Sequence, residues 1–365
     1  EETKIEANEV DIIAGQDFVG KGLAISSESD TSIFAAADVT LTALEKNYTV
    51  NSPSTRVIPG KDGEPAKVVN TGGGRQVSIR EQKISTLDVG GDLSIVTSGD
   101  LVLAGLKGKI DGKTSLSAGG DLLLAAVQSE TKIKAGNTRI HQVTSHTTSL
   151  ESGGDFVANA GGKAILVGTD IDSGGKVQLA AADDVVLAAS QDIYTYDYRK
   201  KKGGFFYKKE TVVSKTRVTN KGTSIAALGD VDIISQTGDL TTAGTGFASG
   251  QGDVNLSAIE GDIYAGVYTD IFRSYSKTSK SILGGLLGST RIANSVDRIN
   301  TGTEALAALD LSLVSGNDTT LIGAQLSAGR QLSIKTGGDF SVQAAIDSQR
   351  RDFFSHETGL VLMAG

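Results

Sequence analysis

The stretch "GGDLSIVTSGDLVLAG", residues 90–105, contains the same short pattern twice. Gly-Asp comes first and apolar residues then alternate with others, as Leu93 and Ile95 in the first copy and Leu101 and Leu103 in the second. Alternation at a period of two places one row of side chains on the inner face of a strand and the next row on the outer face. We therefore expect Leu93 and Ile95 to line one wall of a narrow core, and Leu101 and Leu103 to line the next wall.

The pattern recurs along the chain, and its spacing predicts a coiled fold. Related copies lie at 120–124, 154–156, 175–179, 229–233, 252–256, 261–263 and 338–342. Spacings of 8 or 9 residues correspond to a strand and a turn, and spacings of 21, as from Asp100 to Asp121, correspond to one circuit of a parallel β-helix. Glycine permits positive φ at a corner, and aspartate can bond its own turn. Because a single coil cannot bury its apolar face alone, the coils must stack. We expect an all-β solenoid of roughly 13 coils, about 60 Å long at the spacing of β-strands.

The composition agrees with a narrow core. Glycine accounts for 46 of 365 residues and aromatic residues for 5%, while apolar residues reach 39%. A core of many small layers suits these values better than a thick globular core. The chain has a net charge of −8 and no cysteine, which excludes a disulfide scaffold and thiol-ligated metals. No apolar run approaches the roughly 20 residues that span a bilayer.

A longer period overlies the coils. Small or apolar residues are followed by an acidic residue at Glu45, Glu130, Asp192, Asp270 and Asp347. After most of these positions the pattern breaks into a polar, aromatic or basic excursion. We expect coils at 1–44, 76–193, 223–267 and 303–347, and excursions at 45–75, 194–222 and 268–302, with a further one starting at 348–365. All three prolines lie in 45–75, which therefore leaves the solenoid. We expect the chain to be a piece of a longer protein.

The excursions hold twelve of the eighteen aromatic residues and are the candidate contact surfaces. Residues 194–222, "YTYDYRKKKGGFFYKKETVVSKTRVTNKG", predict a protruding β-hairpin with nine basic and two acidic residues. The candidate partner- or membrane-contact residues are Tyr194, Tyr196, Tyr198, Arg199, Lys200, Phe205, Phe206, Tyr207, Phe272, Tyr275, Leu283, Leu286, Leu287, Phe353 and Phe354. Other interpretations stay open. The aromatic hairpin can fold down over the flank of the helix, the run 199–202 can be a solvated turn, and 282–287 can be a packed loop rather than a membrane-insertion element.

Catalytic and metal-binding patterns are scarce. The only histidines are His141, His146 and His356, and we expect them to be surface residues. The stretch "GGLLGST" at 284–290 lacks the lysine of a P-loop. We expect no catalytic residues, no metal and no cofactor.

Two other β-helix functions remain as alternatives. A calcium-binding repeat protein needs tandem nonapeptides. A polysaccharide-degrading enzyme needs clustered carboxylates, whereas Asp100 and Asp121 lie at turns, where capping accounts for them.

Two strings carry a family resemblance. "AGGDLLLAA" (118–126) and "GDVDIISQTGDLTTAG" (229–244) resemble the haemagglutinin repeats of large two-partner-secretion exoproteins, which include filamentous haemagglutinin and the contact-dependent growth-inhibition effectors. The ordered unit at 187–266, with its aromatic and basic insertion, is similar to their second, more C-terminal repeat region. The resemblance covers roughly residues 80–365.

The resemblance implies a right-handed parallel β-helix on the surface of a Gram-negative cell. The chain would be exported unfolded through an outer-membrane partner pore, and its second partner would be the surface or outer membrane of a target cell. It implies a non-enzymatic segment that serves adhesion or toxin delivery, with no catalytic residues to carry over. We expect a monomeric rod that binds no nucleic acid.

Overall fold

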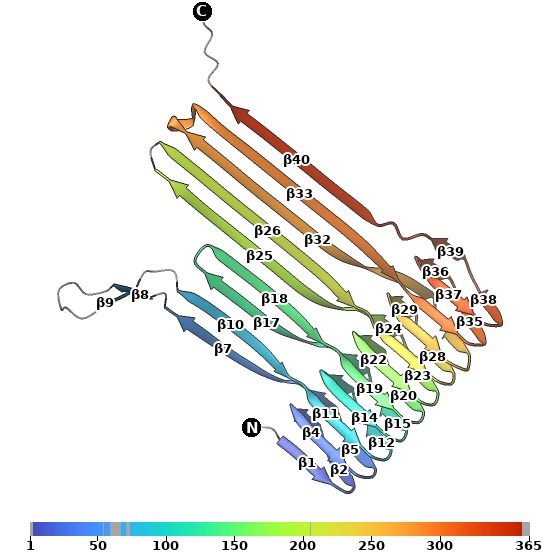
Figure 1. Ribbon diagram of the computed structural model, residues 1–365. Helices are drawn as coiled ribbons and strands as arrows, with labels where there is room; N and C mark the ends of the chain where they lie inside the picture. Colours follow the sequence, from blue (N-terminus) through green and yellow to red (C-terminus); the bar gives the residue numbers. More distant parts are fainter. Residues whose placement is uncertain (1–2, 54, 59–66, 71–73, 205, 360–365) are drawn as a thin grey trace, which may run out of the picture.

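The computed structural model describes residues 3–53, 55–58, 67–70, 74–204 and 206–359. The chain forms a parallel β-helix of three sheets, and antiparallel hairpins rise from one of its corners to form a fourth sheet (Figure 1). The predicted fold class is confirmed. Among the described residues, no helix is long and apolar enough to cross a membrane.

Each coil of the β-helix gives one strand to each of three parallel sheets. The first sheet contains β1 (Thr3–Ala7), β4 (Leu23–Ser27), β11 (Ser85–Val89), β14 (Leu106–Ile110), β19 (Thr148–Ser152), β22 (Thr169–Ser173), β27 (Ser224–Ala227), β30 (Gly246–Ser249), β34 (Glu304–Ala307) and β37 (Gln325–Ala328). The second contains β2 (Val10–Ala14), β5 (Thr31–Ala35), β12 (Leu93–Thr97), β15 (Thr114–Ala118), β20 (Phe156–Ala160), β23 (Val177–Ala181), β28 (Val231–Ser235), β31 (Val254–Ala258), β35 (Asp310–Ser315) and β38 (Gln331–Thr336). The third contains β3 (Phe18–Lys21), β6 (Val39–Thr42), β13 (Leu101–Ala104), β16 (Leu122–Ala125), β21 (Ala164–Val167), β24 (Val185–Ala188), β29 (Leu240–Ala243), the start of β32 (Ile263–Ile282), β36 (Thr319–Ile322) and β39 (Phe340–Gln343).

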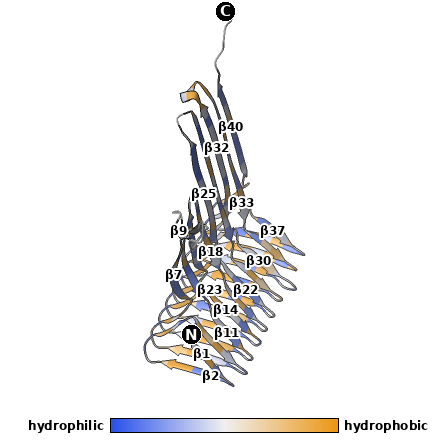
Figure 2. Cartoon of the chain, turned by 60° about the vertical axis from the view of Figure 1, so that its left-hand side comes forward, coloured by the Kyte–Doolittle hydropathy of each residue, from blue (hydrophilic) through white to orange (hydrophobic). Residues whose placement is uncertain are grey.

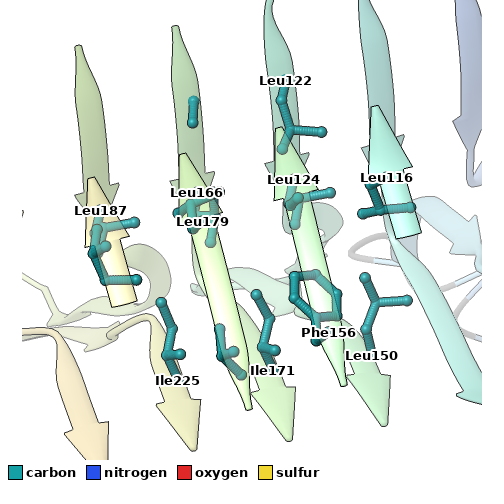
Figure 3. Packing of buried hydrophobic residues seen from close by; sticks show 14 of the residues in the cluster. Leu116, Leu122, Leu124, Leu150, Phe156, Leu166, Ile171, Leu179, Leu187 and Ile225 are labelled. Atoms are coloured by element: carbon teal, nitrogen blue, oxygen red, sulfur yellow. The ribbon is translucent and has the colours of Figure 1, made fainter. Parts of the chain in front are cut away.

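The core is a set of apolar columns that run along the rod. Leu93, Ile95, Leu101 and Leu103 are all 1% exposed or less, so the predicted lining of two walls is confirmed. Within a column each side chain lies on its equivalent in the next coil, as for the Leu124, Leu166 and Leu187 side chains in Figure 3. Full burial of one such leucine is worth about 1.5–3 kcal/mol, which makes stacking of the coils the main source of stability.

The aspartates of the repeat connect successive coils. Asp92 Oδ1 accepts the N–H of Lys113 at 2.8 Å, and Asp100 Oδ1 accepts the N–H of Asp121, one coil later, also at 2.8 Å. The same contact recurs at Asp17, Asp30, Asp38, Asp121, Asp155, Asp184, Asp230, Asp239, Asp253, Asp262 and Asp318. The prediction that aspartate bonds its own turn is wrong for these residues, because the carboxylate accepts a backbone N–H of the next coil.

The third corner of the β-helix alternates between two forms. On every second coil a single glycine with positive φ joins the third sheet to the first: Gly22, Gly105, Gly168, Gly244 and Gly323, with φ between 56° and 62°. On the coils between them the chain leaves the corner in a hairpin and returns. A glycine is required at the short corner because other residues rarely adopt this conformation.

The hairpins pair side by side into one antiparallel sheet. Its strands, in order, are β7 (Leu44–Ser52), β10 (Arg75–Lys83), β17 (Val127–Ala135), β18 (Thr138–His146), β25 (Ser190–Gly203), β26 (Tyr207–Lys221), the rest of β32, β33 (Leu287–Gly302) and β40 (Ser348–Thr358). A separate pair, β8 (Thr55–Ile58) and β9 (Lys67–Asn70), extends the first hairpin. Two coils advance along the rod by two strand spacings, about 9.6 Å, and a hairpin is also two strands wide. Hairpins on alternate coils therefore meet edge to edge.

Two expectations about the organisation of the chain are corrected. Each parallel sheet has ten described strands, so the rod has ten described coils and a length of about 45 Å rather than thirteen coils. The range 76–193, expected to be coils throughout, contains the hairpin Val127–His146, and its first residues belong to β10. The excursions thus take up more of the chain than the proline and aromatic residues indicated.

Candidate contact surface on the hairpin sheet

The hairpin sheet is a single layer. Most side chains along β25 and β26 are partly or fully exposed on both of its faces, and Figure 2 shows the sheet edge-on beside the β-helix. The aromatic hairpin does not fold down over the flank of the helix but pairs laterally with β18 and β32. Such a sheet is stabilised by cross-strand side-chain pairs rather than by a core, and it offers both faces to a partner.

The register places the three tyrosines of β25 on one side, which we call the tyrosine face. Tyr194, Tyr196 and Tyr198 lie opposite Gln142, Ile140 and Thr138 of β18. In the row of Tyr196, apolar side chains continue over five strands as Val50, Val77, Ile133, Ile140 and Tyr196. One row of the tyrosine face is therefore apolar across the first hairpins.

The other predicted aromatic residues are divided between the two faces. Phe272 shares the tyrosine face, where the Arg217 guanidinium carbon lies 5.3 Å from the centre of its ring. Phe353 is on the same face and is 81% exposed on β40, the last strand of the sheet. Tyr275 and Phe354 point to the opposite face. Phe205 lies outside the described residues.

The hairpin ends gather five of the predicted residues. The Leu283 N–H donates to the Phe206 carbonyl at 2.9 Å, which joins the turns of two neighbouring hairpins. We call the resulting cluster the distal apolar tip; its residues, all exposed, are Phe206, Tyr207, Ile282, Leu283, Leu286 and Leu287. Leu283 belongs to the short 3₁₀ turn η1 (Leu283–Gly285) and has a φ of 53°. Residues other than glycine seldom adopt a positive φ, so this leucine has an unusual backbone conformation.

Basic side chains lie directly below the tip. Lys202, Lys209 and Lys280 stand opposite one another on three strands of the tyrosine face. No carboxylate of the described residues lies within 4 Å of their amines. Residues 199–202 are part of strand β25, so they do not form the solvated turn that was one interpretation of the sequence.

On the opposite face, Glu210 neutralises the cations around it. Glu210 Oε1 accepts two hydrogen bonds from Arg199, at 2.9 and 3.1 Å, and lies 3.7 Å from Lys201 Nζ. The Arg199 hydrogen bonds, with the charges of Lys201 and Lys277, hold the pKa of Glu210 below its ordinary value. The row of Lys202, Lys209 and Lys280, by contrast, lies on the tyrosine face.

The hairpin Val127–His146 carries a side-chain cluster that the sequence did not indicate. Glu130 Oε1 accepts hydrogen bonds from Lys132 Nζ and His141 Nε2, both at 2.7 Å. Glu130 and His141 are eleven residues apart, and only the pairing of β17 with β18 brings them together. The turn at Gly136-Asn137 was the available signal. Among the described residues, no group of three His, Cys, Asp or Glu side chains is arranged to hold a metal ion.

Comparison with known proteins shows a partial match to one family. The haemagglutinin-repeat family matches residues 133–205 and 262–358. Two segments of the chain thus match haemagglutinin repeats, and we call the chain the repeat region below. Each matched segment of the repeat region includes both β-helix coils and strands of the hairpin sheet, so the family pattern covers the junction between them.

The repeat region is similar to parts of two much longer proteins. It is 24% identical over 321 residues to the tRNA nuclease CdiA-2 of Burkholderia pseudomallei (strain 1026b), which covers 79% of this chain and 10% of that protein. It is 27% identical over 266 residues to the tRNA nuclease CdiA of Escherichia coli (strain STEC_O31), which covers 72% of this chain and 8% of that protein. The repeat region thus spans about a tenth of the length of these relatives. No solved structure shows significant similarity to it.

Proposed function

We propose that this repeat region is a non-catalytic part of a secreted exoprotein on the surface of a Gram-negative bacterium. In this proposal it engages a neighbouring cell, either as an adhesin or to deliver a toxin. The β-helix is the rigid support, the hairpin sheet is the contact element, and the distal apolar tip meets the surface or outer membrane of the target cell.

The exposure of the distal apolar tip is the observation that carries the proposal. Phe206 is 66% and Leu286 58% exposed, and the tip lies at the end of the hairpins away from the β-helix, where Figure 2 shows apolar residues on an otherwise hydrophilic sheet. Apolar side chains backed by lysines are typical of elements that enter an anionic membrane interface. The row of Lys202, Lys209 and Lys280 supplies that charge beside the tip.

The relatives and the composition support a role in export and delivery. Two relatives are named tRNA nucleases, and the repeat region matches about a tenth of each. We assign the nuclease activity of such proteins to parts outside the matched segment. The absence of cysteine from the 365 residues is compatible with export of an unfolded chain through an outer-membrane pore, because no disulfide can form before passage.

The test replaces the distal apolar tip in the full-length exoprotein that carries this region. The variant Phe206→Ser/Leu283→Ser/Leu286→Ser removes apolar surface that is already exposed, so the fold is retained. The matched control is Leu228→Ser/Ile259→Ser/Leu309→Ser, which changes side chains of similar exposure at two corners of the β-helix. We expect the tip variant to bind target cells at least about tenfold more weakly, since removing several large apolar contacts costs more than 1.4 kcal/mol. Equal binding by both variants would contradict the proposal.

A further inference from the structure

A groove lies on the opposite face of the sheet, away from the tyrosines and from the distal apolar tip. It crosses β10, β17, β18 and β25 and has a volume of about 440 Å³. Its polar lining residues, here called the basic groove, are Gln76, Ser78, Lys132, Lys134, Arg139, His141, Thr195 and Asp197. The groove is built by three neighbouring hairpins, so it exists only because the hairpins pair with one another.

The basic groove holds two cations that form no ion pair with a described residue. Lys134 and Arg139 are direct cross-strand neighbours in the hairpin of β17 and β18. Like charges in this position repel each other and destabilise the pair. No carboxylate of the described residues lies within 4 Å of either cation. Asp197, the neighbour of Arg139 on β25, instead accepts a hydrogen bond from the Ser214 hydroxyl at 2.7 Å.

The other two basic side chains of the groove are already occupied. Lys132 and His141 both donate to Glu130, whose pKa is lowered mainly by the hydrogen bond from Lys132 and further by that from His141. The attraction for an added anion therefore centres on Lys134 and Arg139. Arginine presents a planar fork of donors that matches a phosphate oxygen pair, and lysine adds a point charge.

The neighbours of this pair suit a sugar. Gln76 is next to Lys134 on one side and Asp197 next to Arg139 on the other, so one row across the sheet reads amide, cation, cation, carboxylate. Sugar hydroxyls both donate and accept hydrogen bonds, and an amide and a carboxylate meet both needs. A second groove of about 390 Å³ shares Ser78 and Lys132 and continues the surface toward Asn47 and Arg80, which leaves room for more than one sugar unit.

We propose that the basic groove binds a phosphorylated saccharide, with the phosphate between Lys134 and Arg139 and the sugar hydroxyls on Gln76, Thr195 and Asp197. The two cations then gain an ion-pair partner. This inference is independent of the distal apolar tip, which is made of other residues.

The test measures binding of glucose 1-phosphate to the full chain by saturation-transfer NMR and calorimetry, with inorganic phosphate, glucose and glucuronic acid as comparison ligands. We expect glucose 1-phosphate to bind at least about tenfold more tightly than any of the three, because only it combines the doubly charged group with the hydroxyls. Equal affinity for inorganic phosphate would overturn the saccharide assignment, and equal affinity for glucuronic acid would overturn the phosphate assignment.

Variants locate the site. Lys134→Gln/Arg139→Gln should lose binding by about tenfold or more, since each cation makes charge-assisted hydrogen bonds. The control Lys107→Gln/Lys335→Gln removes the same charge from exposed positions on the β-helix and should bind as the parent does. Thermal unfolding of all three proteins checks that each is folded. Equal loss in both variants would show that net charge rather than this groove is responsible, and an unchanged affinity in the groove variant would also overturn the proposal. The distal tip variant should bind the sugar normally, so the two proposals fail separately.

Discussion

Asp192 Oδ1 accepts the backbone N–H of Ser145 at 2.6 Å, at the base of the boundary between two neighbouring hairpins. In return the Ser145 hydroxyl donates to the Gln191 carbonyl at 2.9 Å. The backbone ladder between β18 and β25 ends just before this point, where the two strands separate to join different coils. Beyond the last backbone pair, the two strands are thus joined by the Asp192 carboxylate and the Ser145 hydroxyl.

A similar pair of contacts, with an asparagine amide in place of the serine hydroxyl, occurs at the two following hairpin boundaries. Asp270 accepts the N–H of Asn220 and Asp347 that of Asn300, both at 2.8 Å. The last three acidic residues of the long period therefore mark the positions where one hairpin is attached to the previous one. At the first boundary a serine hydroxyl, Ser129, accepts the N–H of Gln82, so Glu130 is one residue away from the equivalent position.

Replacing the Asp192 carboxylate should loosen the hairpin boundary without affecting the coils. In Asp192→Ala we expect the opening free energy of the Ser145 amide to fall by about 1–2 kcal/mol, because a hydrogen bond to a charged acceptor is lost. Amide hydrogen exchange measures this directly. Asp172→Ala, at an exposed strand position on the β-helix, is the control and should leave Ser145 protected. Unchanged exchange at Ser145 in Asp192→Ala would contradict this role.

The short corners should be intolerant of a side chain for two separate reasons. Gly168 has a φ of 56°, and a Cβ there would collide with the Ser190 side chain, whereas Gly136 has the same φ and nothing within 4 Å of such a Cβ. Both alanine variants lose about 1–2 kcal/mol from backbone conformation. Gly168→Ala should lose at least about 1 kcal/mol more from overpacking, seen as a lower midpoint of thermal unfolding. Similar midpoints for the two variants would show that the corner is not packed as described.

The columns of the core should dominate stability. Phe156 is 0% exposed, and Phe156→Ala should cost about 3–5 kcal/mol through lost burial and a cavity. Phe353→Ala, on the exposed edge strand, should change the free energy of unfolding by less than about 0.5 kcal/mol. Denaturant unfolding of the two variants distinguishes them. An equal loss of unfolding free energy in both variants would show that Phe353 is buried, which contradicts the structure.

Acid should weaken one link between coils in a predictable direction. The hydrogen bond from Lys163 Nζ, 2.7 Å from Asp184 Oδ2, and then the N–H of Asp239 lower the pKa of Asp184 in the folded state. A carboxyl with a lowered pKa stabilises the fold above its unfolded pKa, near 4, and this stabilisation is lost as the pH falls through the folded pKa. The Lys163→Gln variant lacks the main cause, so its unfolding midpoint should fall less between pH 7 and pH 2 than that of the parent. Parallel curves would mean that the pair does not contribute.

The coils could be predicted from the sequence because each strand has one buried face. Leu93 and Ile95 alternate with residues that are more exposed, and Gly-Asp marks the corner before them. The alternation and the corner residues therefore predict the same strand. The aromatic hairpin at 194–222 was also recognisable, because its length and its lysines do not fit a coil.

The lateral pairing of the hairpins could not be predicted from a sequence pattern of this kind. Both faces of the sheet are exposed, so no strict alternation marks its strands, and partners such as Val143 and Ile193 are 50 residues apart. The hairpin of β17 and β18 has nine-residue strands without proline or aromatic residues and resembles coil sequence. The basic groove and the distal apolar tip depend on that pairing, so neither could be assembled from the sequence.

Cross-linking tests most directly whether hairpins from different coils form one continuous sheet. Thr211 and Thr278 are direct neighbours across the boundary between β26 and β32, and the chain has no other cysteine to interfere. Neighbouring Cα atoms about 4.5–5.5 Å apart are within disulfide reach, so Thr211→Cys/Thr278→Cys should oxidise to an intramolecular disulfide. Arg291 is one strand further in the same row, about 9.6 Å from Thr211 and out of reach. Efficient bridging in the first pair and none in Thr211→Cys/Arg291→Cys is the predicted result. Failure of the first pair, or equal bridging in both, would contradict the paired-hairpin sheet.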